Sequence, residues 1–514
     1  MRHPRDVRRL VRRVLSGPPT LEVGRRSQDA GLDETVVRGA MELALRVGEA
    51  MLSLGAAAAD VAAAILAITR AFGLLGCQVD VTFTAITLSY DRGRSVAPVT
   101  LMRVVTGRVD DYGRLSGVLR VAKEVAARPV RPVDALATLD AADARLDEVV
   151  SAPHPYPRWL VTVLLAVMAA AVAILLGGGF AVAAVAGLTT VGIDRAVWRL
   201  ARWGLPPFFR QAAGAAIATA VAVGILVAAP HLPFELVHLP PSLVVASGIV
   251  VLLAGLSLVG SAEDAISGFP VTASGRAFEV VVLTLGIVAG IGGVLDMARR
   301  AGVPLEVIAV PTNSSPLVVQ ALAAALVAAA WGLASYARLR AAAASAAAGG
   351  VAWVIFTVAT GWGLGAAVAS AVAALVIGFL AESVGPHLRV PPLVISVCGI
   401  VPLLPGLAIY RALFQLVSEP ASNGGMGPGA TGLVAAATVG LGLAAGVTLG
   451  EFVAAAWRRG REARRDRALA PAGTGASARP QDVAAGDGQT LSASSATLEA
   501  PDVDALPAAD ASTP

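Results

Sequence analysis

The amino-acid sequence predicts a polytopic α-helical membrane protein of about ten transmembrane helices, preceded by a small α+β domain. The first observation is composition, because 56% of the 514 residues are apolar and only 15% are charged, which is too hydrophobic for a soluble protein. The second is distribution, because the first 150 and last 60 residues hold most of the charges. The third is an 18-residue stretch of the apolar middle that occurs twice.

The repeated stretch is VPPLVISVCGIVPLLPGL at Val390–Leu407 and LPPSLVVASGIVVLLAGL at Leu239–Leu256. Nine of the 18 aligned positions are identical, at a constant offset of 151 residues, and they include two proline pairs and two glycine pairs. An apolar composition produces many coincident Leu and Val residues, but it does not readily place Pro and Gly in one register. We interpret the stretch as an internal repeat of a membrane domain. The alternative is two unrelated apolar helices that both begin with proline.

From Trp159 onward, the chain contains ten apolar segments of about the length that crosses a bilayer. They are residues 159–176, 179–193, 208–229, 242–262, 277–297, 316–335, 341–359, 362–381, 392–416 and 430–456. With ten crossings, most arginines of the connecting segments fall on one side, which the positive-inside rule places in the cytoplasm together with both termini. The two copies of the repeat lie five segments apart, so the second copy is inserted upside down. We therefore expect two five-helix inverted repeats, an arrangement common in secondary transporters.

The expected domain organisation follows from these patterns. A basic tail (1–29) precedes a cytoplasmic α+β domain (30–152), the two membrane repeats (153–300 and 301–457), and a tail (458–514) that is first basic and then disordered.

Within the α+β domain, apolar residues alternate from Val79, and the alternation changes phase at Ala85–Ile86, which predicts a strand with a bulge or tight bend. A second strand is expected at 99–105, and Asp33 and Asp60 are candidate helix caps.

Several classes of function lack their signatures in this sequence. Cys77 and Cys398 are the only cysteines, and the five histidines are scattered, so no disulfide framework, metal site or cofactor is predicted. Phosphate-binding loops and the hydrolase motifs GxSxG and HExxH are absent, so neither ATP-driven transport nor enzymatic activity is expected. No nucleic-acid partner is expected. A membrane-embedded enzyme, or a scaffold or sensor that uses residues 30–152, stays open as an alternative.

The first candidate site residues are ionisable groups close to the apolar segments, because charges at membrane depth are costly and are retained for function. Glu263 and Asp264 directly follow the fourth segment, where a carboxylate can bind a proton or the ammonium group of a substrate. Arg276 and Glu279 are three residues apart at the start of the fifth segment, so they can pair on one helix face and act as a gate. The alternative is that all four merely mark helix ends at the membrane interface.

The second group of candidates lies in the ninth segment, where Pro405 and Gly406 are expected to break the helix. A broken helix exposes carbonyl and N–H groups, which can bind the ammonium and carboxylate groups of an amino acid. The first copy keeps Gly255 but lacks both inner prolines, so it is expected to be straighter. We expect substrate between Gly255 and Gly406, within reach of Tyr410. The alternative is a kink that serves packing.

Three stretches of the sequence resemble the threonine/serine exporter family, proton-driven amino-acid efflux proteins of the bacterial inner membrane. They are Ala44–Tyr90, Ala262–Ile291 and Val401–Leu416, and the resemblance extends over about 35–456. It implies a cytoplasmic N-terminal domain, ten spans, and export of threonine and serine against an inflow of protons across the inner membrane. It also favours Asp264 over Glu263. Export of another small metabolite or a dipeptide stays open, as does the oligomeric state.

Overall fold

The computed structural model describes residues 33–92, 96–228, 241–253, 255–303, 315–406, 408–409, 411–412, 415 and 427–469, and all structural statements concern these residues. Side chains are not described for 241–242 and 459–469. The chain divides into two units, Met1–Arg461 and Glu462–Pro514. The structure describes only the end of helix α18 from the second unit.

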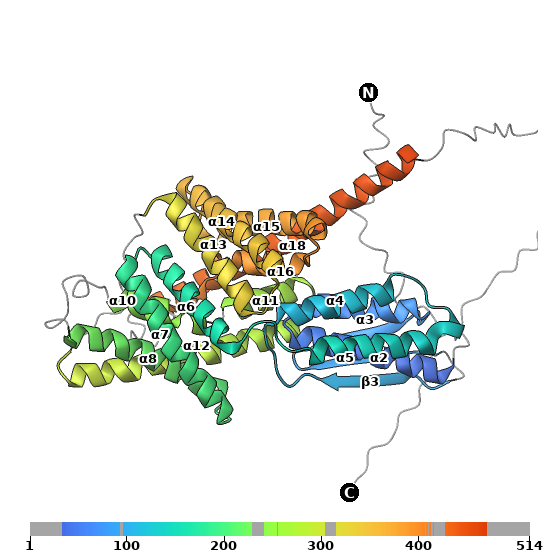
Figure 1. The fold of residues 1–514 in the computed structure, drawn as a ribbon, viewed down its shortest axis with the longest axis horizontal. Helices are drawn as coiled ribbons and strands as arrows, with labels where there is room; N and C mark the ends of the chain where they lie inside the picture. Colours follow the sequence, from blue (N-terminus) through green and yellow to red (C-terminus); the bar gives the residue numbers. More distant parts are fainter. Residues whose placement is uncertain are drawn as a thin grey trace, which may run out of the picture. The chain divides into compact units, whose positions relative to one another are not determined.

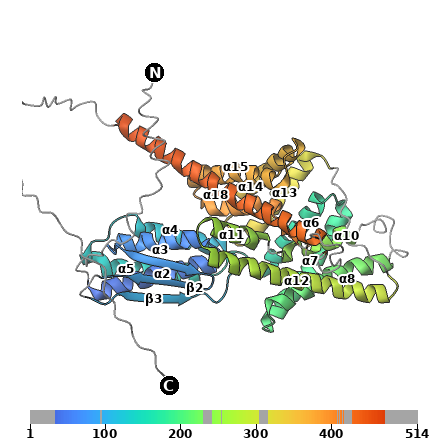
Figure 2. The ribbon, with the colours of Figure 1, turned by 180° about the vertical axis from the view of Figure 1, so that it is seen from behind.

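The N-terminal α+β domain (residues 33–151) contains an antiparallel sheet in the order β1-β2-β3 (Figures 1 and 2). Its strands are β1 (Cys77–Thr82), β2 (Ala85–Tyr90) and β3 (Val99–Val104). Thr82 pairs with Ala85, so the expected bend is a hairpin with a two-residue turn. The change of phase in the sequence marks this turn, after which Ile86, Leu88 and Tyr90 face the core. The expected strand at 99–105 is confirmed as β3.

Helices cover one face of this sheet. They are α2 (Glu34–Ser53), α3 (Ala58–Ala71), α4 (Tyr112–Ala126), the 3₁₀ helix η1 (Pro132–Asp134) and α5 (Ala135–Ser151). Helices α2 and α3 pack on the strands, and α4 and α5 pack on α2 and α3. The Asp33 side chain caps α2 as expected, by accepting a hydrogen bond from the Thr35 amide. Asp60, in contrast, lies in the first turn of α3, and the residue at the cap position, Ala57, supplies no side-chain hydrogen bond.

Eight helices of the described chain are long and apolar enough to cross a membrane. They are α6 (Arg158–Leu175), α7 (Phe180–Arg202), α8 (Pro207–Ala228), α12 (Pro270–Arg300), α13 (Leu317–Ala334), α14 (Leu339–Gly361), α15 (Ala366–Leu388) and α18 (Pro428–Leu469). The fourth predicted segment is a pair of helices bent by 51°, which makes a ninth span if counted as one. The ninth predicted segment contributes the shorter apolar helix Pro392–Leu403. The protein is therefore a polytopic helical membrane protein.

The two copies of the repeat have the same broken backbone. The first copy forms α10 (Pro241–Ile249), the 3₁₀ helix η3 (Val250–Leu252) and α11 (Gly255–Ile266). The second forms α16 (Pro392–Ile400) and the 3₁₀ helix η4 (Val401–Leu403). The residue after each 3₁₀ turn is extended, with ψ of 129° at Leu253 and 134° at Leu404.

The first copy, which the sequence predicts to be the straighter one, is therefore also broken. It breaks at the same position although Val251 stands where the second copy has Pro402. Proline is not the feature that the two breaks share. Both breaks are followed by a glycine, Gly255 or Gly406, and these glycines pack closely against the opposite copy.

The α+β domain packs on the ends of several membrane helices. The Thr272 hydroxyl near the start of α12 donates to the Val81 carbonyl at 2.8 Å, and a Cβ on Gly275 would lie 2.8 Å from the Phe83 ring. The Tyr112 amide donates to the Ser335 carbonyl between α13 and α14 at 2.9 Å. Helix α11 thus ends beside this domain. Helix α16 begins beside it, because residues at its start share a hollow with α4.

Candidate functional site

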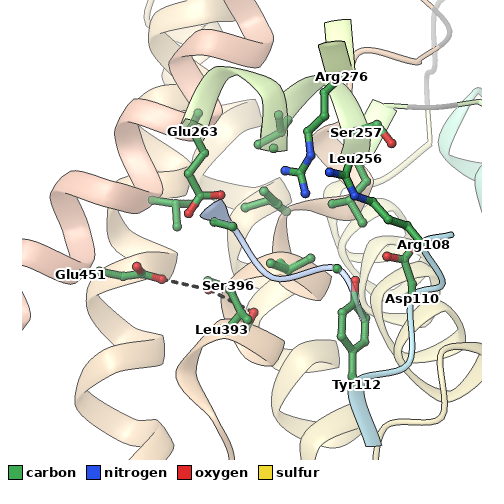
Figure 3. A pocket seen from close by; sticks show the side chains of 18 of the residues that line it. Arg108, Asp110, Tyr112, Leu256, Ser257, Glu263, Arg276, Leu393, Ser396 and Glu451 are labelled. Atoms are coloured by element: carbon green, nitrogen blue, oxygen red, sulfur yellow. Dashed lines mark hydrogen bonds between the residues drawn. The ribbon is translucent and has the colours of Figure 1, made fainter. Parts of the chain in front are cut away.

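A charged cavity of about 210 Å³ lies where α11, α12, α16 and α18 meet two loops of the α+β domain (Figure 3). Six ionisable side chains line it: Arg108, Asp110, Glu263, Arg276, Glu279 and Glu451. Hydroxyl groups of Tyr112, Ser257 and Ser396 also line it. The cavity thus combines four carboxylates and two guanidinium groups with hydroxyls in a small space, which is costly to assemble near a membrane unless the charges are used.

An ion pair between Asp264 and Arg276 lies beside this cavity. The Arg276 Nη1 atom is 2.9 Å from Asp264 Oδ2, and their side chains are 8% and 0% exposed. Arg276 therefore pairs with Asp264 across the α11–α12 turn, rather than with Glu279 on its own helix. A Cβ at position 260 would lie 2.8 Å from Arg276 Nη1, so Gly260 leaves the room in which the guanidinium group lies against α11.

The α+β domain completes the surroundings of this ion pair with its backbone. Asp264 Oδ1 accepts a hydrogen bond of 2.9 Å from the amide of Ala58, the first residue of α3. Arg276 Nη2 donates to the Ala56 carbonyl at 3.4 Å. The first amides of a helix lack partners within the helix and favour a negative charge. Asp264 thus supplies from a membrane helix the capping group that Ala57 cannot supply.

Two further carboxylates face the cavity from the membrane helices. Glu263 projects from α11 and Glu451 from α18, and Figure 3 shows both directed towards the same space. Glu451 Oε1 accepts a hydrogen bond of 3.1 Å from the Ser396 hydroxyl on α16. Glu451 is not among the candidates predicted from the sequence. It stands inside the tenth apolar segment, so the argument that selected Asp264 also applies to it.

The loop between β3 and α4 brings the other missed residues into the cavity wall. The Arg108 guanidinium group lies 4.6 Å from the centre of the Phe83 ring, and burial, together with the charge of Arg276, lowers its pKa. Burial raises the pKa of the Asp110 carboxyl, against the effect of Arg276. No sequence pattern indicated these residues, because a short polar loop gives no sign of which distant segments it contacts in the fold.

The predicted position between Gly255 and Gly406 is filled by protein. A Cβ on Gly255 would lie 3.1 Å from Leu404 Cβ and 3.4 Å from the Gly406 amide nitrogen. A Cβ on Gly406 would lie 2.9 Å from Leu253 Cβ. The two broken helices therefore cross in direct contact, and their breaks face each other as expected. However, no space for a substrate lies between them.

The two glycines instead line a second, mostly apolar cavity of about 150 Å³. Leu256 lines both cavities. Of the eight candidates from the sequence, Glu263, Arg276 and Glu279 line the charged cavity, and Asp264 pairs with Arg276. Pro405 is buried at the crossing, and Tyr410 lies outside the described residues.

Gly406→Ala is expected to destabilise the protein by about 1–3 kcal/mol, because the added methyl group overpacks the crossing. Gly255→Ala is expected to have a smaller effect in the same direction. The control is Gly293→Ala, since a Cβ at Gly293 meets no atom within 4 Å and alanine favours a helix. Thermal unfolding of the purified variants measures the effect. A Tm for Gly406→Ala at or above that of the control would contradict the tight crossing.

A helical membrane protein that holds a charged, solute-sized cavity beside two crossing broken helices has the organisation of a membrane transporter. The comparisons with known proteins agree with this class. Residues 42–298 match the family "Putative threonine/serine exporter", and residues 320–453 match "Threonine/Serine exporter, ThrE". The chain belongs to the threonine/serine exporter family, which is a family of transporters and not of enzymes.

Two relatives extend the similarity over most of the chain. The "Probable threonine/serine exporter" of Mycobacterium tuberculosis is 38% identical over 464 residues, covering 88% of this chain and 84% of that protein. The "Threonine/serine exporter" of Corynebacterium glutamicum is 36% identical over 434 residues, covering 83% and 85%. No solved structure matches.

Proposed function

We propose that this chain exports threonine and serine, and that the charged cavity binds them. The observation that carries the proposal is the presence of both signs of charge in one small cavity. A zwitterionic amino acid needs an anionic partner for its ammonium group and a cationic partner for its carboxylate. The volume of about 210 Å³ is below the roughly 300–1,000 Å³ of sites for drug-sized ligands. It favours a single amino acid over a dipeptide.

Each part of the substrate has a candidate partner in the cavity. Glu263 and Glu451 bind the ammonium group, since both carboxylates face the cavity from the membrane helices. Arg108 binds the carboxylate, because Arg276 is already engaged by Asp264. The Ser257 hydroxyl is available for the hydroxyl group that threonine and serine share. Thus the α+β domain contributes directly to substrate binding.

The proposed architecture consists of ten spans in two inverted five-helix repeats, 153–300 and 301–457, in the inner membrane. Its support is the direction of the two copies, because α11 runs towards the α+β domain and α16 runs away from it. The distribution of arginine residues supports a cytoplasmic location for the α+β domain and both termini.

The proposed transport cycle uses the helix crossing as the barrier between the two cavities. The α+β domain covers the charged cavity on the cytoplasmic side, so loading requires this domain to move. Coupling to proton inflow is supported by the cluster of carboxylates around Asp264. Burial, followed by the charge of Asp264, raises the pKa of Asp60 at the start of α3, so a proton is taken up more readily there than by a carboxyl in water.

Glu451→Gln is expected to lower threonine and serine counterflow in proteoliposomes by about 10- to 100-fold, because a charged hydrogen-bonding partner of the ammonium group contributes about 1.5–3 kcal/mol. Radiolabelled threonine and serine measure the exchange, and an unlabelled dipeptide serves as competitor. The control is Asp296→Asn, since Asp296 forms exposed ion pairs at the end of α12. If the natural protein shows no counterflow of threonine or serine, the proposed function is wrong. An unimpaired Glu451→Gln variant would remove only the assigned residue.

A further inference from the structure

A second hollow, of about 370 Å³, lies where α4 of the α+β domain meets the α13–α14 and α15–α16 turns. Four arginines line it from three separate segments: Arg120, Arg338, Arg340 and Arg389. None of the described residues that line it carries a carboxylate. The charged side chains of this hollow are thus all positive, whereas the charged cavity described above holds both positive and negative side chains.

These arginines stay unpaired within the part of the chain that the structure describes, because neither a carboxylate nor a ring contacts any of the four guanidinium groups. Other arginines of the α+β domain find partners, as Arg103 does with Glu42 and Glu49. Like charges that converge on one hollow repel each other. An anion in the hollow would remove this repulsion.

The backbone of the two turns points to the same use. Among the described residues, Tyr336 and Arg389 are the only ones other than glycine with positive φ, at 60° and 56°. The left-handed conformation is unfavourable for a residue with a Cβ atom, and glycine is usual at the end of a helix. Arg389 occupies this position at the end of α15. The chain thus adopts an unfavourable conformation at a residue whose side chain lines the hollow.

The position of the hollow identifies the kind of anion. It lies at the ends of the membrane-length helices α14 and α15, where the apolar side chains Leu339 and Leu388 are 69% and 41% exposed. Guanidinium groups bind phosphate oxygens with paired hydrogen bonds, and exposed leucines suit acyl chains. We propose that the four arginines bind the phosphate of an anionic phospholipid in the leaflet that faces the α+β domain.

The bound lipid has a structural consequence that is independent of the transported substrate. Ser116 and Arg120 belong to α4, whereas Arg338, Arg340 and Arg389 belong to the membrane helices and their turns. One phosphate therefore bridges the α+β domain and the membrane helices. Anionic lipid then strengthens the docking of this domain.

Native mass spectrometry of the full-length chain in detergent, titrated with phosphatidylglycerol or phosphatidylcholine, tests the proposal. Arg338→Gln with Arg389→Gly is expected to weaken phosphatidylglycerol binding by about 30-fold, since each arginine near an anionic lipid contributes about a factor of five. Glycine suits the left-handed position at 389, so this variant is expected to fold. The matched control is Arg199→Gln with Arg202→Gln, two exposed arginines at the end of α7.

Three measurements decide the outcome. The natural chain must prefer phosphatidylglycerol to phosphatidylcholine, and the control pair must keep that preference. Arg389→Lys, which retains the charge, must bind phosphatidylglycerol better than Arg389→Gly. Equal losses in the control and the Arg338/Arg389 variant would overturn the site, because they would indicate a general effect of surface charge. Displacement of phosphatidylglycerol by millimolar inorganic phosphate would assign the site to a soluble anion and overturn the lipid.

Discussion

Asp264→Asn is expected to abolish export and to destabilise the protein by about 3–5 kcal/mol, because the buried Arg276 charge loses its partner. The amide oxygen of the substituted side chain can still accept the hydrogen bond from the Ala58 amide, so the variant removes the charge and keeps the cap of α3. The double variant Asp264→Asn with Arg276→Gln removes both charges. It is expected to regain most of the lost stability but none of the lost export.

This pair of variants separates a structural role from a role in transport. Thermal unfolding reports stability, and threonine counterflow in proteoliposomes at several internal and external pH values reports export and its coupling to protons. Asp111→Asn is a useful control, because Asp111 is also a buried helix-capping carboxylate, on α4. If the double variant recovers both stability and export, the ion pair only holds the fold together. If Asp264→Asn exports at the natural rate, Asp264 has no part in the cycle.

Local patterns in the sequence predicted most of the helical architecture. All ten apolar segments contain helix in the structure and occur in the expected order. The repeat was visible because proline and glycine, unlike leucine and valine, rarely coincide by chance. Its glycines lie at the crossing, where the close approach of two backbones leaves little room for a Cβ atom.

Other parts of the site depend on tertiary contacts that local patterns do not encode. The first copy breaks without its inner prolines, next to a glycine that packs against the second copy. The carboxylate that caps α3 belongs to Asp264, which is 206 residues away from its hydrogen-bond partner Ala58. Arg108 and Asp110 enter the cavity wall only because the α+β domain docks there. A single sequence gives no signal for such docking.

A disulfide that fixes the α+β domain to α12 is expected to stop export reversibly, because this domain covers the charged cavity on its side. Phe83→Cys with Gly275→Cys suits the purpose. A Cβ on Gly275 would lie 3.1 Å from Phe83 Cβ, a few tenths of an ångström shorter than the usual range of about 3.5–4.5 Å for a disulfide. Both positions lie outside the group of side chains that line the cavity. Export is expected to fall to background when the pair is oxidised and to return on reduction.

The matched control is Asp80→Cys with Thr87→Cys, since these residues pair across β1 and β2 and their disulfide stays within the α+β domain. Cys77 is replaced by alanine in both proteins, because it is half-buried at the start of β1, whereas Cys398 is buried in the membrane helices. Peptide mass spectrometry confirms which disulfide has formed.

Equal counterflow of the oxidised and reduced Phe83/Gly275 protein would show that substrate reaches the cavity without movement of the domain. An equal loss in the control would trace the effect to oxidation in general. Only a loss confined to the bridge between the domain and α12, and reversed by reductant, makes the domain a moving part of the transport cycle.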